Sequence, residues 1–155
     1  MRSGRRLAID VGKVRIGLAI SDFHGILASG LTNVPRAKTL EQTCEAILLA
    51  IQDEDLLEIF VGLPLAMSGT HTASTLDAIE VAKALSELVS VPVKMIDERL
   101  STVSATASLR ASGRDSKSGR KVIDQIAATV ILEQALQIEK QTGQAAGVSL
   151  EDLDD

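Results

Sequence analysis

The spacing of apolar residues changes near residue 36, and this change limits the possible folds more than any other feature of the sequence. Three short apolar runs precede it, separated by turns that contain glycine, at residues 6–11, 15–21 and 26–34. Short apolar runs joined by such turns are typical of neighbouring antiparallel strands. The start of the chain is therefore predicted to be a three-stranded antiparallel meander.

After this point, helix-like and strand-like segments alternate. Apolar residues recur at helical spacing in four segments, 39–51, 73–89, 102–111 and 121–139. Continuous apolar runs at 57–63 and 91–96 predict two buried strands. The sequence thus predicts an α/β chain with a mixed five-stranded sheet flanked by helices. This is the element order of the RNase H-like fold, which the halves of actin-like ATPases share.

The length and composition predict one domain with a short tail. A chain of 155 residues can bury a proper core, which we expect within residues 1–140. Four of the last five residues are acidic, so residues 141–155 are expected to form a disordered tail. No apolar run could cross a membrane and no signal peptide is evident, which predicts a cytoplasmic protein. The single cysteine, Cys44, excludes a disulfide framework and is expected to be a buried thiol, with an exposed thiol linking two chains as the alternative.

The charge pattern leaves room for a nucleic-acid ligand. The net charge is −5 and the only aromatic residues are two Phe, so base stacking on aromatic side chains is disfavoured. Basic residues that could contact phosphates gather in two groups: Arg2, Arg5, Arg6, Lys13 and Arg15, and then Arg110, Arg114, Lys117, Arg120 and Lys121. The second group is a candidate clamp on a nucleic-acid backbone, or simply a solvated loop.

Acidic residues stand at the ends of two predicted strands. Asp10 ends an apolar strand, where a carboxylate must be paired, hydrogen-bonded or metal-bound unless it only caps the turn. Asp97 and Glu98 follow the last predicted strand, at the end where open α/β sheets bind ligands. Adjacent residues of a strand point to opposite faces, so only one of these two is expected to share a site with Asp10.

A third acid, Asp124, lies near the start of the last helix, close to Ala127 and Ala128. These small residues allow the helix to approach the sheet closely, although the helix dipole alone could also explain Asp124. Clustered carboxylates repel one another unless cations neutralise them, and oxygen ligands alone suit Mg²⁺ or Mn²⁺. The three positions together predict a two-cation site for hydrolysing phosphodiester bonds.

Four blocks of the sequence, at residues 7–22, 61–69, 97–102 and 124–128, stand in the order of a known family. They resemble the YqgF family of the RNase H-like superfamily, which includes pre-16S rRNA nucleases and Holliday junction resolvase-like proteins. The resemblance extends from about residue 6 to residue 136. One departure is Lys13-Val14, where the family often has a small residue followed by Lys.

This resemblance implies a divalent-metal-dependent nuclease that processes the 5′ end of pre-16S rRNA in ribosome biogenesis. It assigns the catalytic and metal-binding acids to Asp10, Glu98 and Asp124, with Asp97 as a neighbour of the site or the alternative ligand. The nucleic-acid-binding residues expected around them are Arg15, Arg99, Arg114, Lys117, Arg120 and Lys121.

Other functions compatible with the pattern are weaker. Cleavage of four-way DNA junctions uses the same chemistry, and pre-16S rRNA is favoured over branched DNA by the resemblance alone. Junction cleavage would need a dimer with two sites, and we expect a monomer or a weak homodimer. An actin-like phosphotransferase would need a second half that a 155-residue domain lacks. The complete set of acids disfavours a non-catalytic ribosome-assembly or transcription factor.

Overall fold

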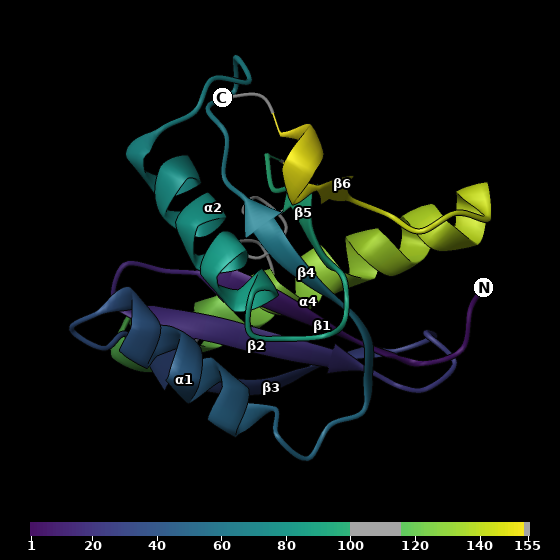
Figure 1. Ribbon diagram of the computed structural model, residues 1–155, viewed down its shortest axis with the longest axis horizontal. Helices are drawn as coiled ribbons and strands as arrows, with labels where there is room; N and C mark the ends of the chain where they lie inside the picture. Colours follow the sequence, from purple (N-terminus) through teal and green to yellow (C-terminus); the bar gives the residue numbers. More distant parts are fainter. Residues whose placement is uncertain (100–115, 154–155) are drawn as a thin grey trace.

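The computed structural model describes residues 1–99 and 116–153. For residues 116–124 it describes the backbone and not the side chains. It has three layers, with one sheet between helices on both of its faces. Figure 1 shows α1 (Leu40–Ala50) and α2 (Ala73–Ser86) in front of the sheet and α4 (Ser116–Thr142) behind it.

The sheet has the strand order β3-β2-β1-β4-β5-β6. Its strands are β1 (Arg5–Val11), β2 (Arg15–Ser21), β3 (Ala28–Pro35), β4 (Leu56–Leu63), β5 (Val93–Asp97) and β6 (Val148–Ser149). The first three strands are antiparallel, β4 and β5 run parallel to β1, and β6 is antiparallel to β5. The predicted α/β, RNase H-like arrangement of a meander followed by alternating strands and helices is therefore confirmed.

The sixth strand differs from the prediction of five. It comes from the segment that was expected to be a disordered tail, and it pairs with the edge of β5. The 3-10 helix η1 (Leu150–Asp152) follows it, and Ala146 just before it is buried. Leu150 and Leu153 pack against the main core, so apolar residues hold a segment whose acidic composition suggested disorder.

Two of the predicted helices also have a different outcome from the rest. The last helix begins at Ser116 rather than at residue 121, so part of the basic Ser/Gly-rich segment is helical. The helix expected at residues 102–111 lies outside the described residues.

No helix in the described ranges is long and apolar enough to cross a bilayer. Cys44 is buried on α1, as predicted for a structural thiol.

The alternation of side chains along the strands divides the core into two clusters. Leu7 and Ile9 of β1 belong to the cluster under α1 and α2, whereas Ala8 belongs to the cluster under α4. The α4 cluster is rich in alanine, and includes Ala19 of β2 and Ala128 of α4. Small residues on both surfaces allow α4 to lie close to the sheet, as predicted from its alanines.

Candidate active site

Asp10 and Glu98 project from the sheet on the side that α4 covers. Asp10 lies two residues beyond Ala8, and Glu98 lies two residues beyond Ile96, and both of those residues face α4. Side chains two residues apart on a strand share a face, so the two carboxylates lie over the same surface. The β1 and β5 ends that carry them are separated by a single strand, β4.

Gly62 of β4 leaves the gap in which these carboxylates meet. It pairs with Ile96 in the register of β4 and β5, and Val61 before it pairs with Ile9 of β1. A Cβ atom at residue 62 would lie 2.6 Å from Cδ of Glu98 and 2.7 Å from Cδ1 of Ile131 on α4. Contacts this short do not occur, so the absence of a side chain at Gly62 is what admits the Glu98 carboxyl group.

The peptide unit between Asp97 and Glu98 is held at both of its polar groups. Its N–H, from Glu98, donates to the carbonyl oxygen of Leu63 at 3.1 Å. Its carbonyl oxygen, from Asp97, accepts a hydrogen bond from Nε2 of Gln134 at 3.3 Å. Bonds from β4 on one side and α4 on the other fix the plane of this peptide, and so the direction in which Glu98 leaves the strand.

The two carboxyl groups interact electrostatically. Glu98 is 9% exposed, and burial together with the charge and hydrogen bonding of Asp10 raises its pKa from 4.5 to about 8. A carboxyl group with this pKa keeps its proton at neutral pH. At neutral pH the two carboxyl groups therefore share one proton. A cation at this position would replace that proton and allow both groups to ionise.

Asp97 has a different partner. It forms a two-armed ion pair with Arg99, whose Nε and Nη2 lie 2.9 and 2.6 Å from Oδ2. Hydrogen bonds from Arg99 lower the pKa of Asp97. The structure thus brings Asp10 together with Glu98 and keeps Asp97 beside the site, as a neighbour that orders Arg99.

The third predicted acid, Asp124, lies on the α4 backbone, and its side chain is outside the described part of the chain. Among the side chains that the structure describes, no group of three or more His, Cys, Asp and Glu residues gathers as metal ligands would. Two of the three predicted acids meet, and the third remains a prediction.

The predicted phosphate-binding residues are distributed unevenly. Arg15 begins β2 and faces the α4 side together with Gly17, the residue opposite Asp10. Arg99 lies at the site, where it binds Asp97 and donates from Nη1 to the carbonyl oxygen of Met67. The side chains of the remaining four are outside the described set: Arg114, Lys117, Arg120 and Lys121.

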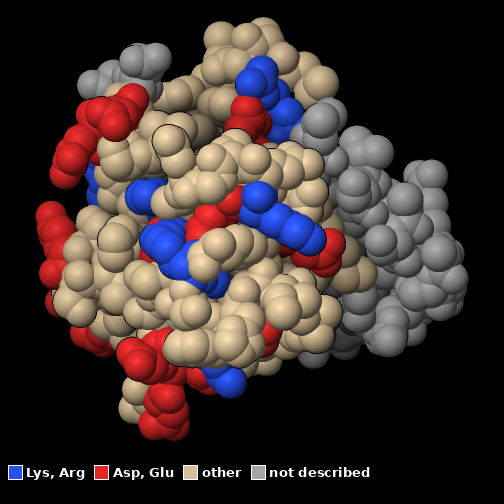
Figure 2. Space-filling view, turned by 90° about the vertical axis from the view of Figure 1, so that its right-hand side faces the viewer, with Lys and Arg blue, Asp and Glu red and all other residues tan. Residues whose placement is uncertain are grey.

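The basic group predicted at the start of the chain does not exist as one surface. Arg6 is fully buried and lies 3.0 Å from Glu139 of α4, and Arg2 binds both Glu139 and Glu58. Arg5 is paired with an acidic residue as well. On the face where the N-terminus emerges, Figure 2 shows basic side chains beside acidic ones rather than an uninterrupted basic area. These arginines lie at the opposite end of β1 from Asp10, and serve the fold.

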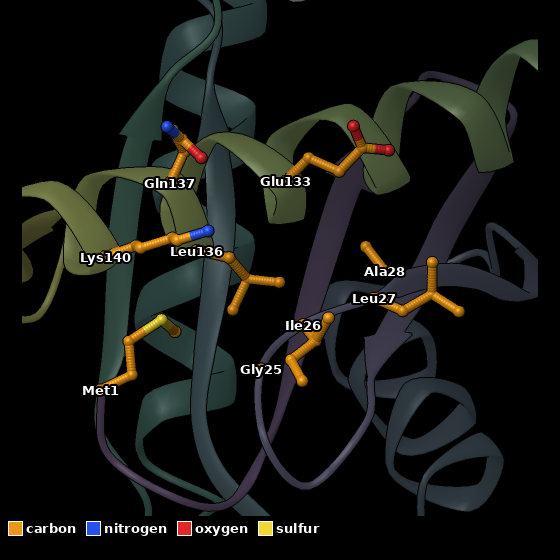
Figure 3. A pocket seen from close by; sticks show the side chains of 9 residues that line it. All are labelled: Met1, Gly25, Ile26, Leu27, Ala28, Glu133, Leu136, Gln137 and Lys140. Atoms are coloured by element: carbon orange, nitrogen blue, oxygen red, sulfur yellow. The ribbon is translucent and has the colours of Figure 1, made fainter.

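A hollow of about 480 Å³ lies between α4 and the loop before β3 (Figure 3). Its lining residues are Met1, Gly25, Ile26, Leu27, Ala28, Glu133, Leu136, Gln137 and Lys140. The loop follows the end of β2 that pairs with the start of β1, so the hollow is at the far end of the sheet from Asp10. It has a single carboxylate, Glu133, so the predicted acids do not meet in this hollow.

Sequence reasoning missed two features of the site. Gly62 was not singled out within the predicted strand 57–63, although a glycine inside a buried apolar strand is itself a signal for close approach by another group. Gln134 carried no such signal, because a glutamine on a long helix is typical of a solvent-facing position. Its role depends on where α4 crosses the end of β5.

An acidic pair lies at the carboxyl ends of β1 and β5, on a mixed sheet covered by a closely packed helix, where the sequence predicted the active site of an RNase H-like nuclease. A family model described as "RuvX: Holliday junction resolvase" matches residues 4–138. The chain belongs to this RuvX family, the YqgF family that the sequence resembles.

Relatives of known name agree with this assignment. A "Putative pre-16S rRNA nuclease" of Leifsonia xyli subsp. xyli is 51% identical over 97% of both chains. A protein of the same name from Clavibacter michiganensis is 50% identical over 95% of this chain and 91% of its own. The solved structure of T. thermophilus RuvC in complex with a Holliday junction substrate matches the fold with a TM-score of 0.56 and 16% identity, over 93% of this chain and 99% of that one. The chain is thus a member of a nuclease family with an RNase H-like fold.

Proposed function

We propose that this protein is a divalent-metal-dependent nuclease that hydrolyses a phosphodiester bond at the 5′ end of pre-16S rRNA. The observation that carries the proposal is the meeting of Asp10 and Glu98 over Gly62, beneath the helix that bears Asp124. The names of the relatives favour the RNA substrate. Such a substrate would place the protein in the cytoplasm.

The residues of the acidic pair fit a hard divalent cation. Burial and mutual repulsion raise the pKa of Glu98, so the two carboxylates favour any positive charge that replaces their shared proton. Their ligand atoms are all oxygens, which suits Mg²⁺ or Mn²⁺ better than zinc. Asp10, Glu98 and Asp124 would hold the metal, and Asp97 would stay in its ion pair with Arg99.

The protein's own residues then have distinct roles. Divalent cations at such a site supply stabilisation of the attacking and leaving oxygens during phosphodiester hydrolysis. Glu98, fixed by the bonds of its peptide to Leu63 and Gln134, sets the position of one carboxylate relative to Asp10. The Asp97 pair keeps the Arg99 guanidinium beside the site, as a candidate contact for a phosphate oxygen of the substrate.

The test compares wild type with Asp10→Asn, Glu98→Gln and Asp124→Asn on a 5′-extended 16S precursor, with Mg²⁺ or Mn²⁺. Glu133→Gln is the matched control, because it removes an exposed carboxylate of α4 that lines the hollow at the far end of the sheet. We expect the first three variants to lose cleavage and the control to retain it. Equal cleavage by wild type and Glu98→Gln would refute the assigned site, and absence of any cleavage by wild type would refute the function.

Cleavage of four-way DNA junctions is a second candidate, favoured by the description of the family model. The same variants assayed on a synthetic four-way junction separate the two substrates. Paired, symmetric cuts in the junction by wild type, without processing of the precursor RNA, would favour the DNA reaction. That outcome also requires a dimer, which sedimentation under the assay conditions would detect.

A further inference from the structure

Two basic segments that are distant in the sequence lie side by side next to the acidic pair. The turn between β1 and β2 carries Lys13 and Arg15, and Arg15 pairs with Pro35 at the end of β3. The chain continues from there into Arg36 and Lys38, and the N–H of Arg36 donates to the carbonyl oxygen of Val14 at 2.9 Å. The register of β2 and β3 thus brings residues 14–15 against residues 35–36 at the carboxyl end of β1, with Lys13 and Lys38 next to them along the chain.

Arg36 fixes the shape of this region. Its Nη1 donates to the carbonyl oxygen of Gly12 at 3.2 Å and to Oδ2 of Asp77, on α2, at 2.7 Å. The turn itself is closed by the N–H of Gly12 donating to the carbonyl oxygen of Arg15 at 3.0 Å. These bonds tie the Arg36 guanidinium to the turn and to α2, so Arg36 serves to hold the turn.

Two other basic residues of this region, Lys13 and Lys38, are available to an anion. Lys13 and Lys38 are exposed, and no salt bridge found within the described ranges involves either of them. Arg15 is half-buried and faces the same side of the sheet as Asp10. The acidic residues of this region are Asp10, three residues before Lys13, then Asp77, which binds Arg36, and the exposed Glu41 of α1.

We propose that Lys13 and Lys38 form a phosphate-binding surface, along which the nucleic-acid backbone continues away from the acidic pair, while Arg36 positions the turn. The inference rests on the proposed nuclease function and adds the direction in which the substrate runs. An acidic protein of net charge −5 repels a polyanion at long range, so local basic residues beside the site are needed to recruit it. Phosphate contacts of this kind fix the register of the strand without recognising its sequence.

The test measures the salt dependence of binding. A fluorescently labelled 5′-extended 16S precursor fragment is titrated with Asp10→Asn protein, which should bind the probe without cutting it. Each lost phosphate contact lowers the slope of log K against log salt by about 0.7 for single strands and about 0.9 for duplex. The Lys13→Gln/Lys38→Gln variant in this background should therefore bind more weakly and lower the slope by roughly 1.4 to 1.8.

A matched variant removes the same number of charges elsewhere. Lys83 on α2 and Lys140 on α4 are also exposed, and Lys83→Gln/Lys140→Gln should leave the slope unchanged. Lys13→Arg/Lys38→Arg keeps both charges and should also keep the slope. The surface is refuted if the two Gln variants weaken binding equally, or if the Asp10→Asn protein does not bind the probe.

This measurement is independent of cleavage. If wild type fails to process the precursor but the slope changes as expected, the nuclease proposal fails and the binding surface stands. If cleavage is confirmed and the slope does not change, the backbone follows another path. A labelled four-way DNA junction as second probe tells whether the surface accepts both sugars, as phosphate contacts alone would allow.

Discussion

Replacing Gly62 with alanine would test whether the acidic pair depends on the gap in β4. The added Cβ would lie 2.6 Å from Cδ of Glu98 and 2.7 Å from Cδ1 of Ile131, where ordinary contacts begin at 3.4 Å. The Glu98 carboxyl group would have to retreat by about 0.8 Å, and the Ile131 methyl group by about 0.7 Å. One methyl group thus disturbs both the site and the packing of α4.

The two disturbances differ in their consequences. Overpacking of a core position lowers the free energy of unfolding by about 1 to 3 kcal/mol. A displacement of about 1 Å at a reacting group lowers the rate by about 100-fold, which corresponds to about 2.7 kcal/mol of activation free energy. We therefore expect Gly62→Ala to fold with reduced stability and to lose about 100-fold in kcat/KM.

A second substitution separates these effects. Valine at position 131 lacks Cδ1, so Gly62→Ala/Ile131→Val relieves the contact with α4 and leaves the contact with Glu98. Urea unfolding should show that the double variant regains stability relative to Gly62→Ala, and cleavage of the 5′-extended precursor should remain low. Ile131→Val alone is the control, with a loss of about 0.5 to 1.5 kcal/mol in stability and full activity.

The reasoning would be refuted by either of two results. Gly62→Ala with wild-type kcat/KM would mean that Glu98 does not need its observed position. Recovery of activity together with stability in the double variant would mean that α4 packing, and not the carboxylate, limits the reaction.

Three further predictions concern charge. The pKa of Glu98 in the folded state is raised to about 8, so its protonated carboxyl group contributes its full share to the free energy of unfolding below about pH 4.5. This contribution is lost as the pH rises through 8. Thermal unfolding of the metal-free protein should therefore show a pH-dependent loss that Glu98→Gln removes; parallel profiles would contradict the shift. Mg²⁺ or Mn²⁺ should raise the Tm of wild type, and an equal rise for Asp10→Asn would count against a site at the pair. Glu139→Gln should lower the free energy of unfolding by about 3 kcal/mol in urea titrations, because it leaves the buried Arg6 without its carboxylate, and a loss below 1 kcal/mol would refute this role.

The sequence was sufficient for features that depend on local pattern. The period of the apolar residues predicted β1 to β5 and the helices α1 and α2 within a few residues of their observed bounds. Asp10 could be identified as a candidate because a carboxylate at the end of a buried strand must be paired, hydrogen-bonded or metal-bound. Cys44 followed from its place on the apolar side of a helix.

Features that depend on register or on the path of α4 could not be predicted. The choice of Glu98 over Asp97 requires knowing that Ile96 faces α4, which only the packed structure reveals. The two-residue strand β6 is too short to leave a pattern. The regrouping of Lys13 with Lys38 arises from the pairing of β2 and β3, whereas sequence proximity had placed Lys13 with arginines at the opposite end of β1.

The position of α4 links the acidic site to the far end of the domain. Gly62 removes a side chain from the centre of the sheet, so Ile131 and Gln134 of α4 take up the space above the pair. The same helix carries Asp124 near its start and Glu139 near its end, where Glu139 is held by two arginines at the beginning of the chain. A helix tied to the sheet at its middle and its end can shift little along its axis. The buried ion pairs therefore constrain the distance between Asp124 and the other two acids, although they lie at the opposite end of β1 from the chemistry.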